Sequence, residues 1–289
     1  MDANAARKRL RELLAGTEMV VAPGAYDGIT ARAVQAAGYP AVYMTGAGTA
    51  ATLGFPDYGL LGMTEMADNV GRLVQAVTIP VIADADTGYG NELNVVRTVR
   101  EYTARGAAAL HLEDQVFPKR CGHLDDKQVI PSGRFVSKVK AAVDARTDED
   151  LVIIARTDAR AVHSLEEAVE RANLALQAGA DMAFVEAPRD PDEVHAIPRL
   201  VDGPCLFNLV GRGKTPPVSL AEAAEAGYRL VIVPTVLLAA VVEASAAALA
   251  EMQRTGAHPD GGLSLVELFT RFGSGEWDEI RSRYPEAST

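Results

Sequence analysis

Short apolar runs alternate with longer amphipathic stretches along almost the whole chain, and this pattern is typical of strands that are each followed by a helix. Successive runs begin about 30 residues apart, which is the size of one β–α unit. A series of this length predicts an α/β fold of the closed (β/α)8, TIM-barrel type. The expected strands are residues 19–22, 41–45, 80–84, 109–113, 151–156, 182–186, 205–209 and 229–233.

Glycines support these boundaries, because a glycine stands directly before or close to the start of several predicted strands. Gly38, Gly106, Gly179 and Gly227 follow helical stretches, and glycine adopts the left-handed conformation that ends a helix without steric cost. The alternative fold is a doubly wound open sheet, which normally has fewer strands and a glycine-rich phosphate loop after the first one. Residues 22–27 lack that loop, so we favour the barrel.

The chain continues beyond the last predicted strand. Residues 235–255 form an alanine-rich stretch that predicts one long helix, and two short helices are expected around 263–272 and 276–283. We therefore expect an N-terminal helix and a barrel within residues 1–255, followed by a C-terminal helical arm at 256–289. A long apolar helix indicates burial against another subunit. The alternative is packing across the bottom of the same barrel.

Composition narrows the possible functions. The 289 residues are 48% hydrophobic, enough for one large core, and their net charge of −11 argues against non-specific nucleic-acid binding. Two cysteines are too few for a disulfide framework and are typical of a reducing compartment. The amino terminus lacks the apolar segment of a signal peptide, and the apolar stretch 230–250 is interrupted by Pro234 and Glu243. We expect a soluble, cytoplasmic protein without a membrane span.

Polar residues end several of the otherwise apolar strands, where the active site of such a barrel lies. Side chains alternate along a strand, so Asp84 and Asp86 project the same way and can approach Glu113 on the next strand. Clustered carboxylates repel unless a cation lies among them, and an all-oxygen ligand set favours Mg²⁺ or Mn²⁺. Taken alone, Asp84 and Asp86 could instead form a solvated loop or a helix cap. The strand-end residues are Asp84, Asp86, Glu113, Arg156, Glu186 and Asn208.

A long loop after the fourth strand carries a cysteine among basic residues. Cys121 is flanked by Lys119, Arg120 and His123, whose charges would stabilise a thiolate suited to acid–base or nucleophilic chemistry. Long loops on a barrel are commonly lids. The alternative for Cys121 is a small buried residue, and its charged neighbours argue against it.

Five segments together resemble the isocitrate lyase/phosphoenolpyruvate mutase superfamily, over roughly residues 20–234. The string Lys-Arg-Cys-Gly-His at 119–123 is the most specific, and it is more similar to the small lyases, such as methylisocitrate and dimethylmalate lyases, than to most phosphonate-forming mutases. Carboxyphosphonoenolpyruvate phosphonomutase also keeps this cysteine. The segments are residues 84–90, 112–115, 119–123, 154–158 and 213–216.

The resemblance implies roles for individual residues. Asp86 would bind Mg²⁺ (or Mn²⁺) most directly, with Asp84 and Glu113 helping through water, and Cys121 would be the general acid. Other members form homotetramers with exchanged C-terminal helices, which implies the same arrangement here. The remaining catalytic residues implied are Tyr43, Lys119, His123 and Arg156. The implied substrate-binding residues are Thr45, where serine is usual, and Gly46, Ala47, Asp57, Gly122, Arg156, Glu186, Asn208, Arg212 and Thr215.

One position departs from the family pattern. Family lyases usually have Asn-x-x-Glu at the end of the seventh strand, whereas here Asn208 is followed by Gly211 and Arg212. Losing a carboxylate and gaining a guanidinium nearby makes the local charge more positive. This changes which carboxylate-bearing substrate fits the site.

The resemblance implies a Mg²⁺-dependent carbon–carbon lyase. It would split a 2-hydroxy di- or tricarboxylic acid, of the methylisocitrate or dimethylmalate kind, into a 2-oxo acid and a carboxylic acid by retro-aldol chemistry. Tyr43 or a metal-bound hydroxide would take the hydroxyl proton, and Cys121 would protonate the departing carbon. The alternatives are a carboxyphosphonoenolpyruvate phosphonomutase-like enzyme, an oxaloacetate hydrolase or decarboxylase, and a non-catalytic protein that binds metal and oxo acid.

Overall fold

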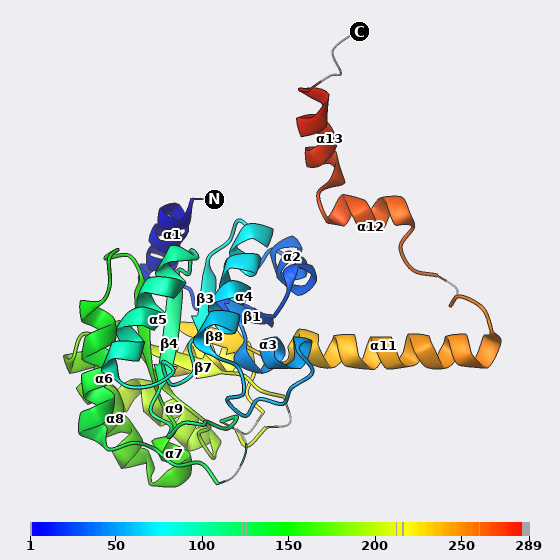
Figure 1. Cartoon of the computed structure of the whole chain (residues 1–289). Helices are drawn as coiled ribbons and strands as arrows, with labels where there is room; N and C mark the ends of the chain where they lie inside the picture. Colours follow the sequence, from blue (N-terminus) through cyan, green and yellow to red (C-terminus); the bar gives the residue numbers. More distant parts are fainter. Residues whose placement is uncertain are drawn as a thin grey trace. The chain divides into compact units, whose positions relative to one another are not determined.

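Eight parallel strands close into a barrel in the computed structural model, and they follow one another in chain order (Figure 1). The model describes residues 2–122, 124, 126–211, 213–215, 217–259 and 261–284. Strand β1 pairs with both β2 and β8, so the sheet has no edge. The predicted barrel is confirmed, and the open sheet is excluded. The strands are β1 (Val20–Ala25), β2 (Val42–Met44), β3 (Val81–Asp84), β4 (Ala109–Glu113), β5 (Val152–Thr157), β6 (Met182–Val185), β7 (Cys205–Asn208) and β8 (Leu230–Val233).

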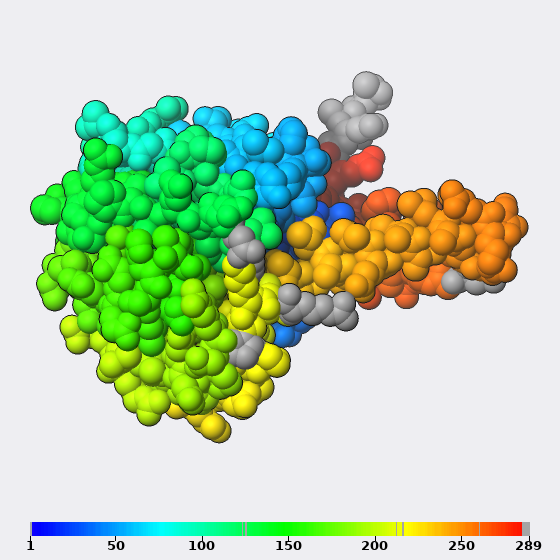
Figure 2. Space-filling model, turned by 90° about the horizontal axis from the view of Figure 1, so that it is seen from below, coloured from blue at the N-terminus to red at the C-terminus, as the bar shows by residue number. Residues whose placement is uncertain are grey.

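Helices surround this barrel, and on the face drawn in Figure 2 the green residues of α6, α7 and α8 lie side by side. The four helix-ending glycines have φ values of 83°, 91°, 102° and 104°, in the left-handed region that glycine favours. The helices of this layer are α1 (Ala3–Ala15), α2 (Gly28–Ala36), α3 (Gly46–Thr52), α4 (Met63–Ala76), α5 (Glu92–Ala104), α6 (Ser132–Asp144), α7 (Ala159–Val162), α8 (Leu165–Gln177), α9 (Pro191–Leu200) and α10 (Leu220–Ala226).

The barrel interior changes from apolar to ionisable along the strands. Toward the amino ends, buried side chains such as Val152 and Ile154 form one apolar cluster. Because every second side chain of a strand points inward, Arg156 follows Ile154 on the same face of β5. On β4, His111 and Glu113 follow Ala109 in the same way. The register pairs Glu113 with Arg156, so the alternation itself places opposite charges side by side.

Helix α1 packs against the amino end of the barrel. Leu10 is fully buried in the interior cluster. Arg7 is also buried, and its Nε donates to the carbonyl of Ala107 at 3.0 Å while its guanidinium contacts Asp148 at 2.6 Å. The amino end is thus filled by apolar side chains, which leaves the carboxyl end for polar groups.

Two units are distinguished by their internal contacts, residues 1–239 and 240–289. The long helix predicted near the carboxyl terminus is present as α11 (Val236–Thr255), followed by α12 (Leu265–Arg271) and α13 (Ser274–Ser282). No residue of α11 is buried. Exposed apolar side chains on it include Val242 and Leu249. Its length and hydropathy alone would also suffice to cross a membrane.

Barrel closure depends on close contact between β1 and the segment after β8. Gly24 is buried on β1, and a Cβ there would lie 2.4 Å from the carbonyl oxygen of Pro234 and 2.6 Å from its Cα. We therefore expect Gly24→Ala to lower the free energy of unfolding by about 1–3 kcal/mol, the usual cost of overpacking, in urea denaturation at a fixed protein concentration.

Gly133 provides the matched control, because nothing lies within 4 Å of a Cβ built there and the residue is helical. Gly133→Ala should leave stability unchanged or raise it by up to about 1 kcal/mol. Equal stability of Gly24→Ala and the wild type would contradict the proposed role of this contact.

Candidate active site

The carboxyl ends of four successive strands bring the predicted polar residues into one cluster. Arg156 on β5 lies at its centre, with Nε 3.2 Å from Oε2 of Glu113 on β4 and Nη2 3.4 Å from Oε2 of Glu186 after β6. Asn208 on β7 donates from Nδ2 to the same Glu186 oxygen at 3.1 Å. Asp158 accepts from Arg156 Nε at 3.0 Å. All the charged members are buried, so these contacts form in a medium of low dielectric.

Asp84 and Asp86 lie on the neighbouring strand end. The backbone N–H of Asp86 donates to Oδ1 of Asp84 at 2.9 Å, and Asp86 itself has a φ of 45°, which aspartate tolerates better than most residues. Burial opposes ionisation of Asp84, but His111, Lys119 and Arg156 outweigh it and lower its pKa to about 2. Burial raises the pKa of Asp86 to about 6, opposed by Lys119 and reinforced by Asp84.

Lys119 joins two loops to this acidic pair. Its Nζ lies 2.5 Å from Oδ1 of Asp57 and 2.8 Å from Oδ1 of Asp86. Lys119 is almost fully buried, although it belongs to the long loop after β4. Asp57, which the resemblance implies as a substrate-binding residue, is therefore joined to Asp86 through Lys119 in a short ion-pair chain.

The donor set suits a hard divalent ion. Among the described residues, Oε1 of Glu113 is buried without a hydrogen-bond partner, while Oε2 of Glu113 and Oδ1 of Asp86 are held by ion pairs with Arg156 and Lys119. Burial holds the pKa of Glu113 well above its usual range, so its ionised form needs further positive charge nearby. As arranged here, however, no three acidic, histidine or cysteine side chains of the described chain converge on one point. The chemistry of these carboxylate oxygens fits Mg²⁺ or Mn²⁺.

The loop that carries Cys121 is held by specific bonds. Gln115 pairs with the backbone of Arg120, donating to its carbonyl at 2.8 Å and accepting from its N–H at 3.0 Å. Lys127 donates to the carbonyl of Gly122 and lies 3.0 Å from Oδ1 of Asp158. The described residues of this loop are therefore tied to the end of β5 by a buried ion pair.

Gly122 brings this loop into direct contact with the cluster. A Cβ at Gly122 would lie 2.5 Å from Nη2 of Arg156 and 2.7 Å from Cγ of Glu186. Cys121, the preceding residue, is partly exposed. The backbone thus covers the guanidinium closely and places the cysteine at the rim of the cluster.

The segment after β2 forms the opposite side of the site. Tyr43 donates from its hydroxyl to Oδ2 of Asp84 at 3.3 Å, and the N–H of Gly46 donates to the same oxygen at 3.2 Å. A Cβ at Gly46 would lie 2.5 Å from that oxygen, so only glycine allows this approach. Thr45 caps the start of α3, and Ala47 is half-buried in its first turn.

Of the three remaining predicted residues, only Thr215 is described, and no hydrogen bond among the described residues joins its side chain to the cluster. Thr215 is buried in the loop after β7, and its hydroxyl has no hydrogen-bond partner among the described residues. His123 and Arg212 lie outside the described residues.

Sequence analysis missed two residues of the site, His111 and Lys127. His111 is fully buried, with Nε2 at 2.8 Å from the hydroxyl of Tyr43, and burial lowers its pKa to about 4, so its ring is neutral near pH 7. Its position two residues before Glu113 on one strand was a usable signal, because both side chains must face the interior. Lys127 gave no such signal, since its partner Asp158 is distant in sequence.

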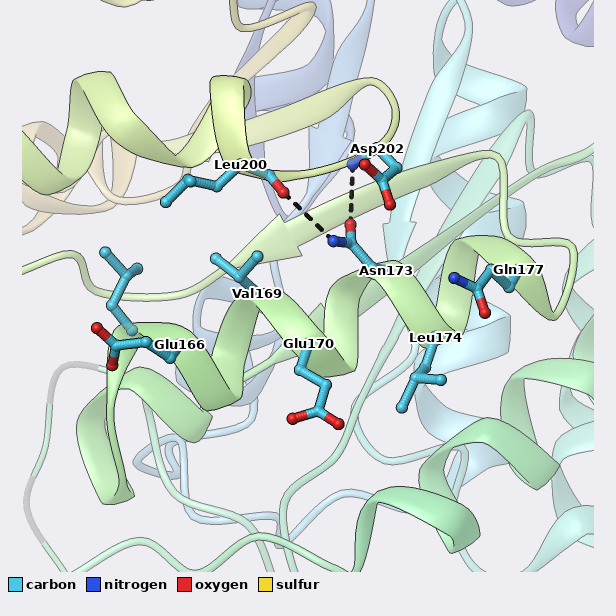
Figure 3. A pocket seen from close by; sticks show the side chains of 9 residues that line it. Glu166, Val169, Glu170, Asn173, Leu174, Gln177, Leu200 and Asp202 are labelled. Atoms are coloured by element: carbon cyan, nitrogen blue, oxygen red, sulfur yellow. Dashed lines mark hydrogen bonds between the residues drawn. The ribbon is translucent and has the colours of Figure 1, made fainter.

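A separate pocket of about 440 Å³ lies on the outer helical layer, between α8 and the end of α9 (Figure 3). Asn173 spans it, donating to the carbonyl of Leu200 at 3.3 Å and accepting from the N–H of Asp202 at 2.8 Å. The carbonyl of Leu200 and the N–H of Asp202 therefore have a hydrogen-bond partner within the pocket. No residue of the strand-end cluster lines this pocket.

Known proteins share this architecture. Residues 10–253 match the family model described as phosphoenolpyruvate phosphomutase. The chain is 48% identical over 228 residues to 2,3-dimethylmalate lyase of Eubacterium barkeri, covering 78% of this chain and 79% of that protein. It is 44% identical over 262 residues to 2-methylisocitrate lyase of Aeropyrum pernix, covering 91% and 83%. The solved structure of oxaloacetate acetylhydrolase with the inhibitor 3,3-difluorooxalacetate matches with a TM-score of 0.95 at 35% identity, covering 99% of each chain.

These similarities agree with the strand-end chemistry described above, and they confirm the predicted family and its lyase class. The chain belongs to the phosphoenolpyruvate mutase/isocitrate lyase superfamily.

Proposed function

We propose that this protein cleaves the carbon–carbon bond of a 2-hydroxy di- or tricarboxylic acid, of the methylisocitrate or dimethylmalate kind, to a 2-oxo acid and a carboxylic acid. The observation that carries the proposal is the buried Arg156 guanidinium, which lies beside the acidic strand ends and beneath the Cys121 loop. A guanidinium binds carboxylates through paired hydrogen bonds, and the adjacent acids suit a divalent ion.

Asp84, Asp86 and Glu113 would hold Mg²⁺ or Mn²⁺. When bound, the ion would polarise the oxygen that becomes the carbonyl of the 2-oxo acid. Oε1 of Glu113, which is buried without a hydrogen-bond partner among the described residues, supports this assignment, because a buried carboxylate oxygen without a partner is costly.

Substrate carboxylates would contact residues on both sides of the mouth. Arg156 and Asn208 would bind one carboxylate, with Lys119 and His123 serving another. Residues 45–47 would hold the 2-oxo-acid end, with Gly122, Glu186, Arg212 and Thr215 completing the pocket. The Gly122 backbone supports this view, because it already lies against Arg156 and Glu186.

Proton transfers account for the remaining chemistry. Tyr43 would take the proton of the 2-hydroxyl as the carbon–carbon bond breaks, and the electron pair of that bond would pass to the departing acid as an enediolate. Burial raises the pKa of Tyr43, so its hydroxyl starts protonated and would take the substrate proton only as its own proton, donated to Asp84 in the resting site, passes to Nε2 of neutral His111 at 2.8 Å. Cys121 would then protonate the enediolate carbon.

The first test is the metal requirement of the reaction. Release of 2-oxo acid from methylisocitrate and from dimethylmalate should be measured with Mg²⁺, with Mn²⁺ and with EDTA. We expect turnover of at least one substrate with either ion and its loss in EDTA, because negative charge on the oxygen that becomes the carbonyl would be uncompensated. Turnover that persists in EDTA would contradict the metal assignment.

Oxaloacetate is the substrate to run in parallel, because the similarity to oxaloacetate acetylhydrolase spans the whole of both chains. Oxalate and acetate formed from oxaloacetate, without cleavage of either hydroxy acid, would establish a hydrolase instead. Phosphorus NMR of reactions with phosphonate substrates would identify a mutase.

A second test concerns Cys121. Cys121→Ser should lower kcat about 100-fold or more with little change in KM, because a hydroxyl is a much poorer acid than a thiol. Cys205 is the matched control: it is buried at the amino end of β7, and Cys205→Ala should retain activity. Equal activity of the two variants would exclude Cys121 as the general acid.

We further propose that the C-terminal helices are exchanged between subunits of a homotetramer. The fully unburied α11, with its apolar side chains, supports this arrangement. Light scattering should give a tetramer for the wild type and smaller species for Val242→Asp with Leu249→Asp, while Glu251→Gln on the same helix should leave the tetramer intact. A wild-type monomer at micromolar concentration, or a wild-type protein that sediments with lipid vesicles, would contradict the proposal.

A further inference from the structure

A second polar cavity lies outside the strand-end cluster, where α5 begins beside α6 (Figure 1). Its volume is about 460 Å³, and none of Asp84, Asp86, Glu113 or Arg156 lines it. The lining residues that matter here are Thr87, Glu92, Phe117, Ile130, Arg134 and Lys138. The cavity therefore adjoins the loops after β3 and β4 from the side of the helical layer.

Lys138 is the unusual residue of this cavity. Three lysines are buried in the described part of the chain, and two of them have carboxylate partners: Lys119 with Asp57 and Asp86, and Lys127 with Asp158. Lys138 is 5% exposed, and its Nζ has one hydrogen bond, to the carbonyl oxygen of Thr87, with no carboxylate within 4.0 Å in the described residues. An ammonium has three donors, so two of them lack a protein acceptor.

A buried cation without a counter-charge is unfavourable. Burial accordingly lowers the pKa of Lys138, although the more distant carboxylates of Glu113, Glu92 and Asp114 oppose the shift. An anion in the cavity would supply the missing charge and accept the two remaining donors.

Arg134 provides a second cation on the same wall. It precedes Lys138 by four residues on α6, so the two side chains lie on one face of the helix. Arg134 is exposed and forms no ion pair within the described residues. Phe117, 54% exposed, and Ile130 add an apolar wall. The lining thus combines two cations that lack carboxylate partners with an apolar surface, and Glu92 is its only acidic residue.

We propose that this cavity is a binding site for a small organic carboxylate with an apolar body, separate from the catalytic cluster. The carboxylate lies between Lys138 and Arg134, and the body packs on Phe117 and Ile130. Such an occupant contacts both loops at once, because Thr87 follows Asp86 and Phe117 precedes the Lys119 segment. Binding therefore stabilises the loops that carry the site without entering it.

The probe is 4-bromobenzoate, which combines a carboxylate with an apolar ring and whose bromine is located by anomalous scattering. Crystals of the full chain soaked with it should show bromine next to Phe117, with the carboxylate between Arg134 and Lys138. Calorimetry should show saturable binding of 4-bromobenzoate with a measurable Kd. Benzamide, which has no charge, should bind at least tenfold more weakly.

Variants separate a ligand site from a structural lysine. Arg134→Gln should weaken 4-bromobenzoate binding several-fold while leaving the Lys138–Thr87 bond intact. Lys138→Met should weaken it at least tenfold. Lys140→Met, on an exposed residue of the same helix that pairs with Asp144, should leave the Kd unchanged.

The proposal is overturned if bromine appears only in the barrel mouth, or if neither Arg134→Gln nor Lys138→Met changes the Kd. It is also overturned if inorganic phosphate binds the wild type while 4-bromobenzoate does not, because the site would then recognise a phosphate. None of these results depends on whether the enzyme is a lyase.

Discussion

The Arg156 guanidinium contacts Glu113, Asp158 and Glu186 at 3.0–3.4 Å in the mouth of the barrel, and the surrounding structure is organised around it. Burying a guanidinium is unfavourable unless its donors are occupied, and here three carboxylates from three strand ends occupy them. One of them, Asp158, also pairs with Lys127. Removing the central charge would leave several acids buried without compensation.

The cluster still contains more carboxyl groups than cations. Asp84 is held ionised, whereas burial raises the pKa of Asp86 and Glu113, so these two groups share too little positive charge. An added divalent ion would restore the balance, and this deficit is the physical reason for assigning one to the acidic strand ends. A catalytic cation and a carboxylate-binding guanidinium would then lie side by side, as cleavage of a hydroxy acid requires.

Two lysines determine how the loops close over this mouth. Lys119 links the Asp57 loop to the acidic pair, and Lys127 ties the Cys121 loop to the end of β5. Both ammonium groups are buried, so their ion pairs are less sensitive to salt than surface pairs. The rim is therefore positioned by charge, while the barrel beneath it is positioned by apolar packing.

Periodicity by itself determined the barrel and the strand-end residues of the site. All eight expected strands are present, with each end within three residues of the expected one, because near-continuous apolar runs of this length are buried on both faces in a parallel sheet. The same two-residue period predicted that Asp84 and Asp86 project the same way and can approach Glu113, since the ends of neighbouring parallel strands lie together. Local sequence determines the direction of these side chains, because the face to which a strand residue points depends only on its position relative to its neighbours.

Tertiary structure alone decided which partners these residues have. Adjacent Glu113 and Asp114 point to opposite sides: Glu113 faces Arg156, whereas Asp114 bonds Thr157 and Arg171 behind the strands. The pairing of Lys127 with Asp158, and the lack of a carboxylate within 4.0 Å of Lys138 in the part of the chain that the structure describes, depend on how loops and helices meet across long sequence separations. No period along the chain encodes those contacts, because they arise only when the strands have closed and the loops pack over them.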